Sequence, residues 1–170
     1  MAGDVAAIAR MVHEPTGTPS ARAVRFWTWN AIVGWAVFLA AQVVWMMILD
    51  AWWAPLHVAG MIATVCAALI EVPIMPRWRY RVHRWEVTDD AVFVRSGWFN
   101  QETRVAPIAR LQTVDSRRGF LERMLGLTTV TVTTASSAGA LKITALDDET
   151  ARELVARLTE VAQLTDGDAT

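Results

Sequence analysis

Residue types that could perform catalysis are few in this chain of 170 residues. The histidines, His13, His57 and His83, lie far apart, and none belongs to an H-E-x-x-H pattern or a similar metal-binding spacing. Ser96-Gly97 lacks the G-x-S-x-G pattern of a nucleophile elbow, and the stretch from Gly119 to Gly126 lacks the Lys-Ser/Thr pair of a phosphate-binding loop. We therefore predict no catalytic residue, no cofactor and no metal. An enzyme or a transporter is the third hypothesis for function, behind two kinds of binding module.

The single cysteine, Cys66, lies inside a long apolar segment, so the chain has neither a disulfide framework nor a zinc site. We expect a thiol buried in apolar surroundings, with a lipid-facing thiol as the alternative.

Two uncharged apolar segments dominate the first half of the chain. Residues 26–49 and 51–70 contain no charged side chain. Each segment is long enough, at ~1.5 Å per residue, to cross a hydrocarbon core ~30 Å thick. Tryptophans lie near the ends of the first segment and in the turn, which is typical of the head-group level. We predict a transmembrane hairpin over residues 26–75, with spans at about 26–49 and 55–75.

The second span contains two adjacent rows of small residues at four-residue spacing. Such rows let another helix approach closely, and the first span is the expected partner because about five residues join the two. The candidate helix-packing residues are Ala59, Gly60, Ala63, Thr64, Ala67 and Ala68. Asp50 and Glu71 are the nearby acidic residues. We place both at the interface with Glu71 paired to an arginine, and keep a contact with another subunit as the alternative.

The arginines predict the orientation of the hairpin. Arg10, Arg22 and Arg25 precede the first span, four arginines follow the second span, and the connecting turn has none. Lys and Arg near span ends favour the cytoplasmic side. We expect a multi-pass protein of the cell (inner or plasma) membrane with both termini in the cytoplasm.

A basic cluster follows the second span. Arg77, Arg79, Arg81 and His83 alternate along a segment that we predict to be a strand, which would place them on one face. This face, together with Arg84, is a candidate contact for anionic lipid head groups. The alternative is that the arginines only set the topology and solvate an edge strand.

The charge of the remaining chain is uneven. Residues 77–123 contain ten arginines and six acidic residues, whereas residues 124–170 contain three basic and seven acidic residues. A nucleic-acid-binding domain needs a broader basic surface than this, so we expect no nucleic-acid partner.

The second half of the chain has the two-residue period and branched side chains of β-strands. We predict strands over 79–88, 91–98, 103–108, 111–116, 127–134 and 141–145. A helix follows, with Asp147 as its N-cap and a buried stripe of Ala151, Leu154, Val155, Leu158 and Ala162.

This order predicts a two-helix transmembrane hairpin followed by a small, mostly β sandwich or open barrel that the C-terminal α-helix caps. Residues 1–25 form an N-terminal tail, with a flexible segment over 14–20. Residues 77–164 form the cytoplasmic domain, and residues 165–170 form a second tail.

Two segments in this domain match a known pattern. Pro107-Ile-Ala-Arg-Leu-Gln-Thr-Val-Asp115 and Leu121-Glu-Arg-Met-Leu-Gly-Leu-Thr-Thr-Val130 resemble the "I-x-R-[IL]-Q-x-V … L-x-R-x-x-G-L-x-T-V" pattern of bacterial pleckstrin-homology-like (PH-like) domains, specifically the YdbS-like membrane proteins. The resemblance covers about residues 24–164 and implies a PH-like fold below two spans. The family commonly has Gln where this chain has Glu122. The family-motif residues are Arg110, Gln112, Val114, Arg123, Gly126 and Leu127.

The apolar residues of the second segment have two interpretations. Leu121, Met124, Leu125 and Leu127 belong to the core, or they line an exposed groove or an oligomer contact.

These observations favour a non-enzymatic, membrane-anchored PH-like interaction module, acting as a scaffold or as an accessory subunit of a membrane complex. The expected partners are the lipid bilayer and either another membrane protein or a second copy of the chain. The alternative is a sensor of anionic lipid head groups.

Overall fold

The structure, a computed structural model, describes residues 14–48, 54–97, 100–134 and 139–167, and the side chains through residue 161. The chain divides into two compact units. One unit comprises residues 24–78, and the other combines the residues up to 23 with those from 79 onward. The second unit is therefore discontinuous in sequence.

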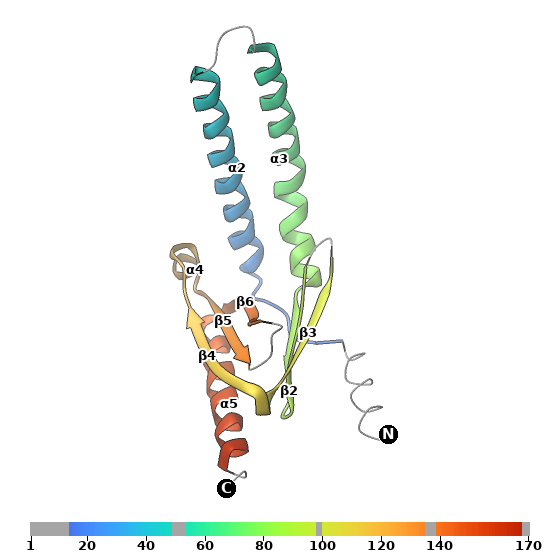
Figure 1. Ribbon diagram of the computed structural model, residues 1–170, viewed down its shortest axis with the longest axis vertical. Coiled ribbons are helices and arrows are strands. Elements are labelled where there is room, and N and C mark those ends of the chain that lie inside the picture. The colour runs from blue at the N-terminus through green and yellow to red at the C-terminus, as the bar shows by residue number, and fades with distance from the viewer. Residues whose placement is uncertain (1–13, 49–53, 98–99, 135–138, 168–170) are drawn as a thin grey trace. The chain divides into compact units, whose positions relative to one another are not determined.

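The first unit consists of most of two long apolar helices, α2 (Ala23–Ile48) and α3 (Ala54–Val82) (Figure 1). Both helices are long and apolar enough to cross a membrane, with a mean hydropathy of 2.1 over their most apolar windows. In this most apolar part, no residue of α2 and 6% of the residues of α3 are buried within the protein. The helices therefore present apolar side chains outward, unlike the core helices of a water-soluble protein.

Helix α3 continues seven residues beyond the predicted end of the second span, so the predicted strand from residue 79 is wrong in its first part. Pro73 and Pro76 lie inside the helix. Each proline removes one backbone hydrogen bond, which neighbouring groups in such helices commonly compensate. The carbonyls that lose a donor are those of Leu69 and Val72. The Arg77 guanidinium donates to a neighbouring carbonyl, that of Pro73, at 2.6 Å. Helix continuity thus prevails over the β propensity of the tryptophan, tyrosine and valine between the arginines.

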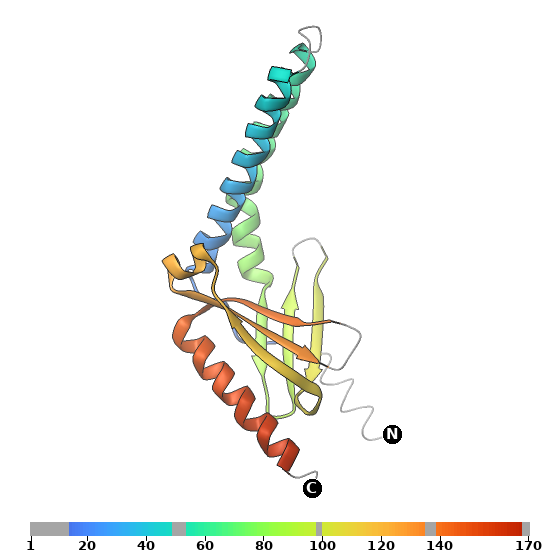
Figure 2. The same ribbon diagram turned by 60° about the vertical axis from the view of Figure 1, so that its left-hand side comes forward.

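The second unit contains two three-stranded antiparallel sheets (Figure 2). The first sheet has the order β1 (Arg84–Val87), β2 (Ala91–Ser96), β3 (Glu102–Pro107), and the second has β4 (Leu111–Arg117), β5 (Leu127–Thr134), β6 (Leu141–Asp147). Helix α5 (Asp148–Gly167) follows β6 directly. The sequence-based prediction of a small PH-like sandwich with a C-terminal helix is confirmed.

The core lies between the two sheets and α5. Val92, Val130 and Ile143 are fully buried, and they join the two sheets into one hydrophobic cluster. Helix α5 contributes Leu154 and Leu158 to that cluster, as its apolar stripe predicts. A 3₁₀ turn, η2 (Ile108–Arg110), and a short helix, α4 (Phe120–Leu125), were not predicted.

Candidate functional site

The four arginines that were predicted to contact lipid do not share a strand face. Arg77, Arg79 and Arg81 lie on the last turns of α3, and Arg84 begins β1. At 100° per residue, Arg77 and Arg81 lie on one side of the helix, and Arg79 lies on another. Arg77 and Arg81 are exposed, whereas Arg79 and Arg84 are half-buried. The exposed basic pair is therefore Arg77 and Arg81.

Arg84 closes the end of α3. Its guanidinium donates to the carbonyls of Tyr80 at 3.0 Å and His83 at 3.1 Å. The last carbonyls of a helix lack partners within the helix, so Arg84 satisfies two of them. This contact occupies the arginine and gives it a structural role.

His83 is buried between the end of α3 and β6. It is 2% exposed, and its Nε2 lies 3.4 Å from the Thr144 hydroxyl. Burial lowers the pKa of the imidazole from its ordinary 6.5 to about 4, and the positive charges of Arg79 and Arg84 act in the same direction. The ring is therefore neutral at physiological pH.

A bulge in β6 contacts the segment before α2 and the segment after α3. The register of β5 and β6 shifts between Thr128 and Val130, and on β6 Ala145 adopts a left-handed conformation with φ of 59°. Thr144, the residue before Ala145, contacts His83. The Ala145 carbonyl itself accepts the Ser20 N–H at 3.0 Å. The bulge thus anchors the segment before α2 as well as the segment after α3.

Residues 14–22, which we call the strap, lie along the domain. Gly17 and Trp85 exchange backbone hydrogen bonds of 2.9 and 3.0 Å, and the Trp85 indole donates to the Thr18 carbonyl at 3.2 Å. The approach requires a glycine, because a Cβ at Gly17 would lie 2.4 Å from the Trp85 carbonyl oxygen. The prediction of a flexible segment at 14–20 is therefore wrong.

The strap ends at β6. The Ser20 hydroxyl donates to Asp147 at 2.7 Å and accepts the Arg22 N–H at 3.2 Å. Asp147, predicted as the N-cap of α5, is the last residue of β6 and uses its carboxylate to hold the strap. The strap therefore contacts one edge strand of each sheet, β1 in the first and β6 in the second.

Strand β3 has an open edge. The Ile108 N–H donates to the Asp90 carbonyl at 2.9 Å, and Pro107 lies opposite Ala91. Because antiparallel pairs alternate, the backbone groups of Thr103 and Val105 point away from β2. Among the described residues, no strand other than β2 pairs with β3.

A groove of about 350 Å³ follows β3. Arg104, Arg110, Thr134 and Leu141 contribute to its lining. Arg110 of the family motif is thus brought to the β3 edge, although Arg104 is already paired with Glu102 at 2.8 Å.

The other family-motif residues divide between core and surface. Leu127 is fully buried and Val114 packs against the core, whereas Gln112 and Arg123 are exposed. Gly126 ends α4 in the left-handed conformation, with φ of 66°, which favours glycine. Much of the motif therefore specifies folding.

Glu122, which replaces the family's Gln, keeps two hydrogen bonds. It is 8% exposed and accepts the Gly119 N–H and the Thr129 hydroxyl, each at 2.6 Å. Each carboxylate oxygen of Glu122 accepts one of these bonds, whereas a glutamine would offer one acceptor oxygen and one NH2 donor, so the carboxylate suits both donors at the start of α4. Met124, one of the expected core residues, is instead exposed.

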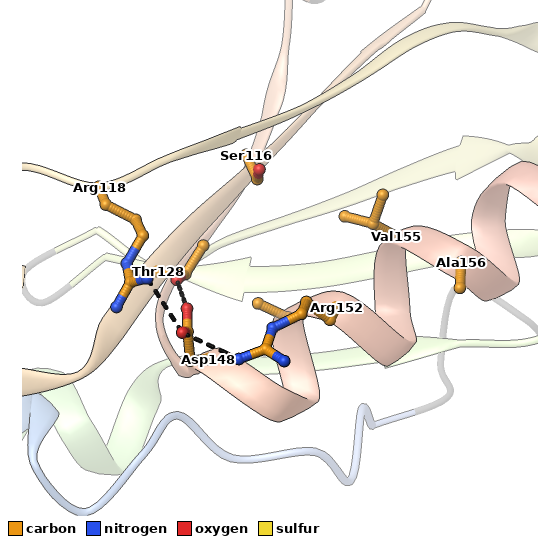
Figure 3. A pocket seen from close by; sticks show the side chains of 8 residues that line it. Ser116, Arg118, Thr128, Asp148, Arg152, Val155 and Ala156 are labelled. Atoms are coloured by element: carbon orange, nitrogen blue, oxygen red, sulfur yellow. Dashed lines mark hydrogen bonds and ion pairs between the residues drawn. The ribbon is translucent and has the colours of Figure 1, made fainter. Parts of the chain in front are cut away.

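A cleft of about 490 Å³ lies between β4, β5 and the start of α5 (Figure 3). At its centre Asp148 accepts the Thr128 hydroxyl at 2.7 Å and pairs with Arg118 at 3.0 Å and Arg152 at 3.2 Å. The Thr128 hydrogen bond lowers the pKa of Asp148, and the Arg152 and Arg118 contacts lower it further. The polar groups of this cleft bind one another, and the bonds from Asp148 to Thr128 and Arg118 hold the start of α5 against the second sheet.

A polar contact joins the two helices of the hairpin. The Gln42 amide donates to the Thr64 hydroxyl at 2.9 Å, and that hydroxyl donates to the Gly60 carbonyl at 3.0 Å. Thr64 is buried and Ala68 half-buried, so these packing candidates face α2. The other packing candidates, Ala59, Gly60, Ala63 and Ala67, are exposed.

Two further predictions concern α3. Cys66 is exposed, so the prediction of a buried thiol is wrong. The hairpin buries one face of α3, and Cys66 lies on another face. Glu71 is half-buried, and within the described residues it forms no ion pair. The described part of the chain also contains no cluster of three or more His, Cys, Asp or Glu side chains that could hold a metal.

The sequence profile of the bacterial PH domain family matches residues 30–162. The chain belongs to the bacterial PH domain family. It is 28% identical over 160 residues to the UPF0699 transmembrane protein YdbS of Bacillus subtilis (strain 168), an alignment that covers 93% of this chain and 99% of the relative. No solved structure matches. With its two apolar helices, this bacterial PH domain protein is a membrane protein with transmembrane helices.

Sequence reasoning missed the strap and the β6 bulge of this bacterial PH domain protein. The only local signal for the strap is Gly17 between Pro15 and Pro19, a composition that also occurs in unstructured loops. No local signal marks Ala145, because alanine is unusual at a positive φ.

Proposed function

We propose that the protein is a non-enzymatic, membrane-anchored interaction module, which binds an extended segment of a second protein along β3. It would act as a scaffold or as an accessory subunit of a membrane complex, with both termini in the cytoplasm. The observation that carries the proposal is the open edge of β3.

The other sheet edges are protected. The strap contacts β1 through Gly17 and β6 through Ser20. Strand β4 has a register irregularity between Leu111 and Thr113, and such bulges hinder further pairing. Strand β3 keeps two residues with outward N–H and C=O groups and a groove beside them, so an added strand finds hydrogen bonds and room for its side chains there.

The chemistry of the groove defines the segment that fits. Val105 is 39% exposed, and Arg110, another lining residue of the groove, is also exposed. We expect an extended segment with an apolar residue opposite Val105 and an acidic residue near Arg110. Pro107 limits pairing to the first part of β3, because its nitrogen cannot donate.

In-cell photocrosslinking of the full chain tests this proposal. A photoreactive amino acid at Thr103 should give a discrete protein adduct, whereas the same group at the exposed Glu160 of α5 should not. Val105→Pro should abolish the adduct because it removes an outward N–H without breaking a bond to β2. The matched Val105→Ala variant keeps that N–H and should retain the adduct. Adducts of equal yield at both positions, or an adduct that survives Val105→Pro, would contradict edge pairing.

Binding of anionic lipid by Arg77 and Arg81 is the second candidate function. Their exposure and four-residue spacing on α3 favour it. Native mass spectrometry of the full chain should show anionic lipid retained, and less of it in Arg77→Gln/Arg81→Gln than in the control Arg157→Gln. Equal retention in the two variants would argue against this function.

A further inference from the structure

We propose that helix α4 is a second membrane contact of the domain, with Phe120 and Met124 inserted among anionic lipid head groups. This inference requires that α2 enters a bilayer, and it is independent of pairing along β3.

Helix α4 exposes two large apolar side chains. Phe120 is 71% exposed and Met124 is 69% exposed. They lie four residues apart, so they share one side of the helix. Two large apolar side chains at neighbouring exposed positions form a patch that water solvates poorly.

The strap contacts the C-terminal end of α4 through Arg22. The Arg22 guanidinium donates to the Leu125 carbonyl, the last residue of α4, at 3.3 Å. It also lies against Gly126, where a Cβ would be 2.9 Å from Arg22 Nη1. Arg22 directly precedes α2, and these two contacts, like its ion pair with Asp147 at 3.9 Å, are made within the domain.

The dimensions of a bilayer then determine the depth of α4. Arg22 lies four residues before Phe26, where the uncharged segment begins, and this distance is about 6 Å along a helix. The head-group region on each side of the hydrocarbon core is roughly 5–8 Å thick. Arg22 therefore lies at head-group depth, and so does the end of α4 that it holds.

Two arginines near α4 are available for lipid phosphates. Arg117 and Arg123 are exposed, and no ion pair engages either of them among the described residues. Arg118 differs, because Asp148 binds its guanidinium. Apolar side chains flanked by free cations are the composition of interfacial helices that bind anionic membranes.

The position of α4 favours lipid over a protein as the occupant of this patch. A partner protein would have to enter the head-group layer, where lipid is already present in excess. The experiment below separates the two occupants, because a disc with one copy of the chain offers lipid alone.

The experiment measures the depth of a nitroxide on the full chain, reconstituted at one copy per nanodisc in a Cys66→Ala background. The label is placed by Met124→Cys, with Glu160→Cys as the aqueous control and Val37→Cys, on the exposed side of α2, as the lipid control. Collision with oxygen reports lipid, and collision with a water-soluble nickel chelate reports water.

In discs of phosphatidylcholine with phosphatidylglycerol, we expect the label at 124 to favour oxygen over nickel, as the label at 37 does. Arg117→Gln/Arg123→Gln should lower the ratio of immersed to free label by roughly fivefold per arginine. Phe120→Ser should reduce immersion in both charged and neutral discs.

A label at 124 that collides with nickel as often as the label at 160 overturns the proposal. So does a label that is immersed only in discs with two copies and shows spin–spin broadening there, because the occupant is then a second chain.

Discussion

Truncation of Leu158 tests the role of α5 as the cover of the core. Leu158 is fully buried in the cluster that joins both sheets. Leu158→Ala removes apolar groups worth roughly 2–2.5 kcal/mol at ~0.8 kcal/mol per methylene. The cavity left behind raises the expected loss of unfolding free energy to about 3–4 kcal/mol. This is a large part of the 5–15 kcal/mol that stabilises typical domains.

Hydrogen exchange of the full chain in nanodiscs measures this loss without interference from the membrane helices. Amides of β5 exchange through opening of the core, so a loss of 3 kcal/mol should accelerate their exchange roughly 100-fold. Glu160→Ala, on the exposed side of α5, is the matched control and should change the free energy by less than ~0.5 kcal/mol. Leu158→Val leaves a smaller cavity and should give an intermediate rate.

The result that would refute this reasoning is equal β5 exchange in Leu158→Ala and Glu160→Ala. Helix α5 would then not close the core, and its apolar stripe would have to serve another contact.

Other predictions concern the pH response, the turns and the topology. Because the pKa of His83 is lowered to about 4 in the folded chain, its contribution to stability is complete above pH 6.5 and is lost as the pH falls toward 4. Lowering the pH from 7.5 to 5 should cost about 2 kcal/mol by β6 hydrogen exchange, and His83→Gln should flatten this dependence. Gly126→Ala should destabilise the domain by about 1 kcal/mol or more in the same assay, because its φ is 66°. Thr64→Val should weaken the hairpin by only ~0.6 kcal/mol in a steric-trap assay. Cysteines in the 50–54 turn should react with impermeant reagents from outside, and one at Ser20 should not; the reverse pattern would overturn the proposed orientation.

Much of the β-domain could be predicted because its signals are local. The alternation of Val130 and Val132 with threonines predicts β5, and the spacing of Leu154 and Leu158 predicts the buried stripe of α5. Both patterns persist over enough residues for their period to be distinguished. The structure places these residues in the core as expected.

The errors occur where distant residues decide the local structure. The segment around Tyr80 has β propensity, but it continues a helix whose earlier turns are already formed. Helix α4 spans six residues, too few for a helical period to be recognised. Its glycine boundaries, Gly119 and Gly126, were the available signal.

The candidate site was less predictable than the fold. The open edge of β3 depends on which strands pair and on where the strap ends, and neither follows from residue types. The exposure of Phe120 and Met124 likewise depends on the face that α4 turns away from the core. Sequence favoured a basic strand face, whereas the structure leaves Arg77 and Arg81 exposed on a helix.

The contacts of the strap depend on the insertion of both membrane helices. Its residues are synthesised before the hairpin, and its partners on β1 and β6 are synthesised after it; Ser20 and Asp147 are 127 positions apart. The strap can cover β1 and β6 only if both stretches emerge on the same side of the bilayer. A chain that threads only one helix leaves the strap and its binding sites on opposite sides, with the edges of β1 and β6 uncovered. Correct threading of both helices is therefore the condition for a domain whose β1 and β6 edges are covered.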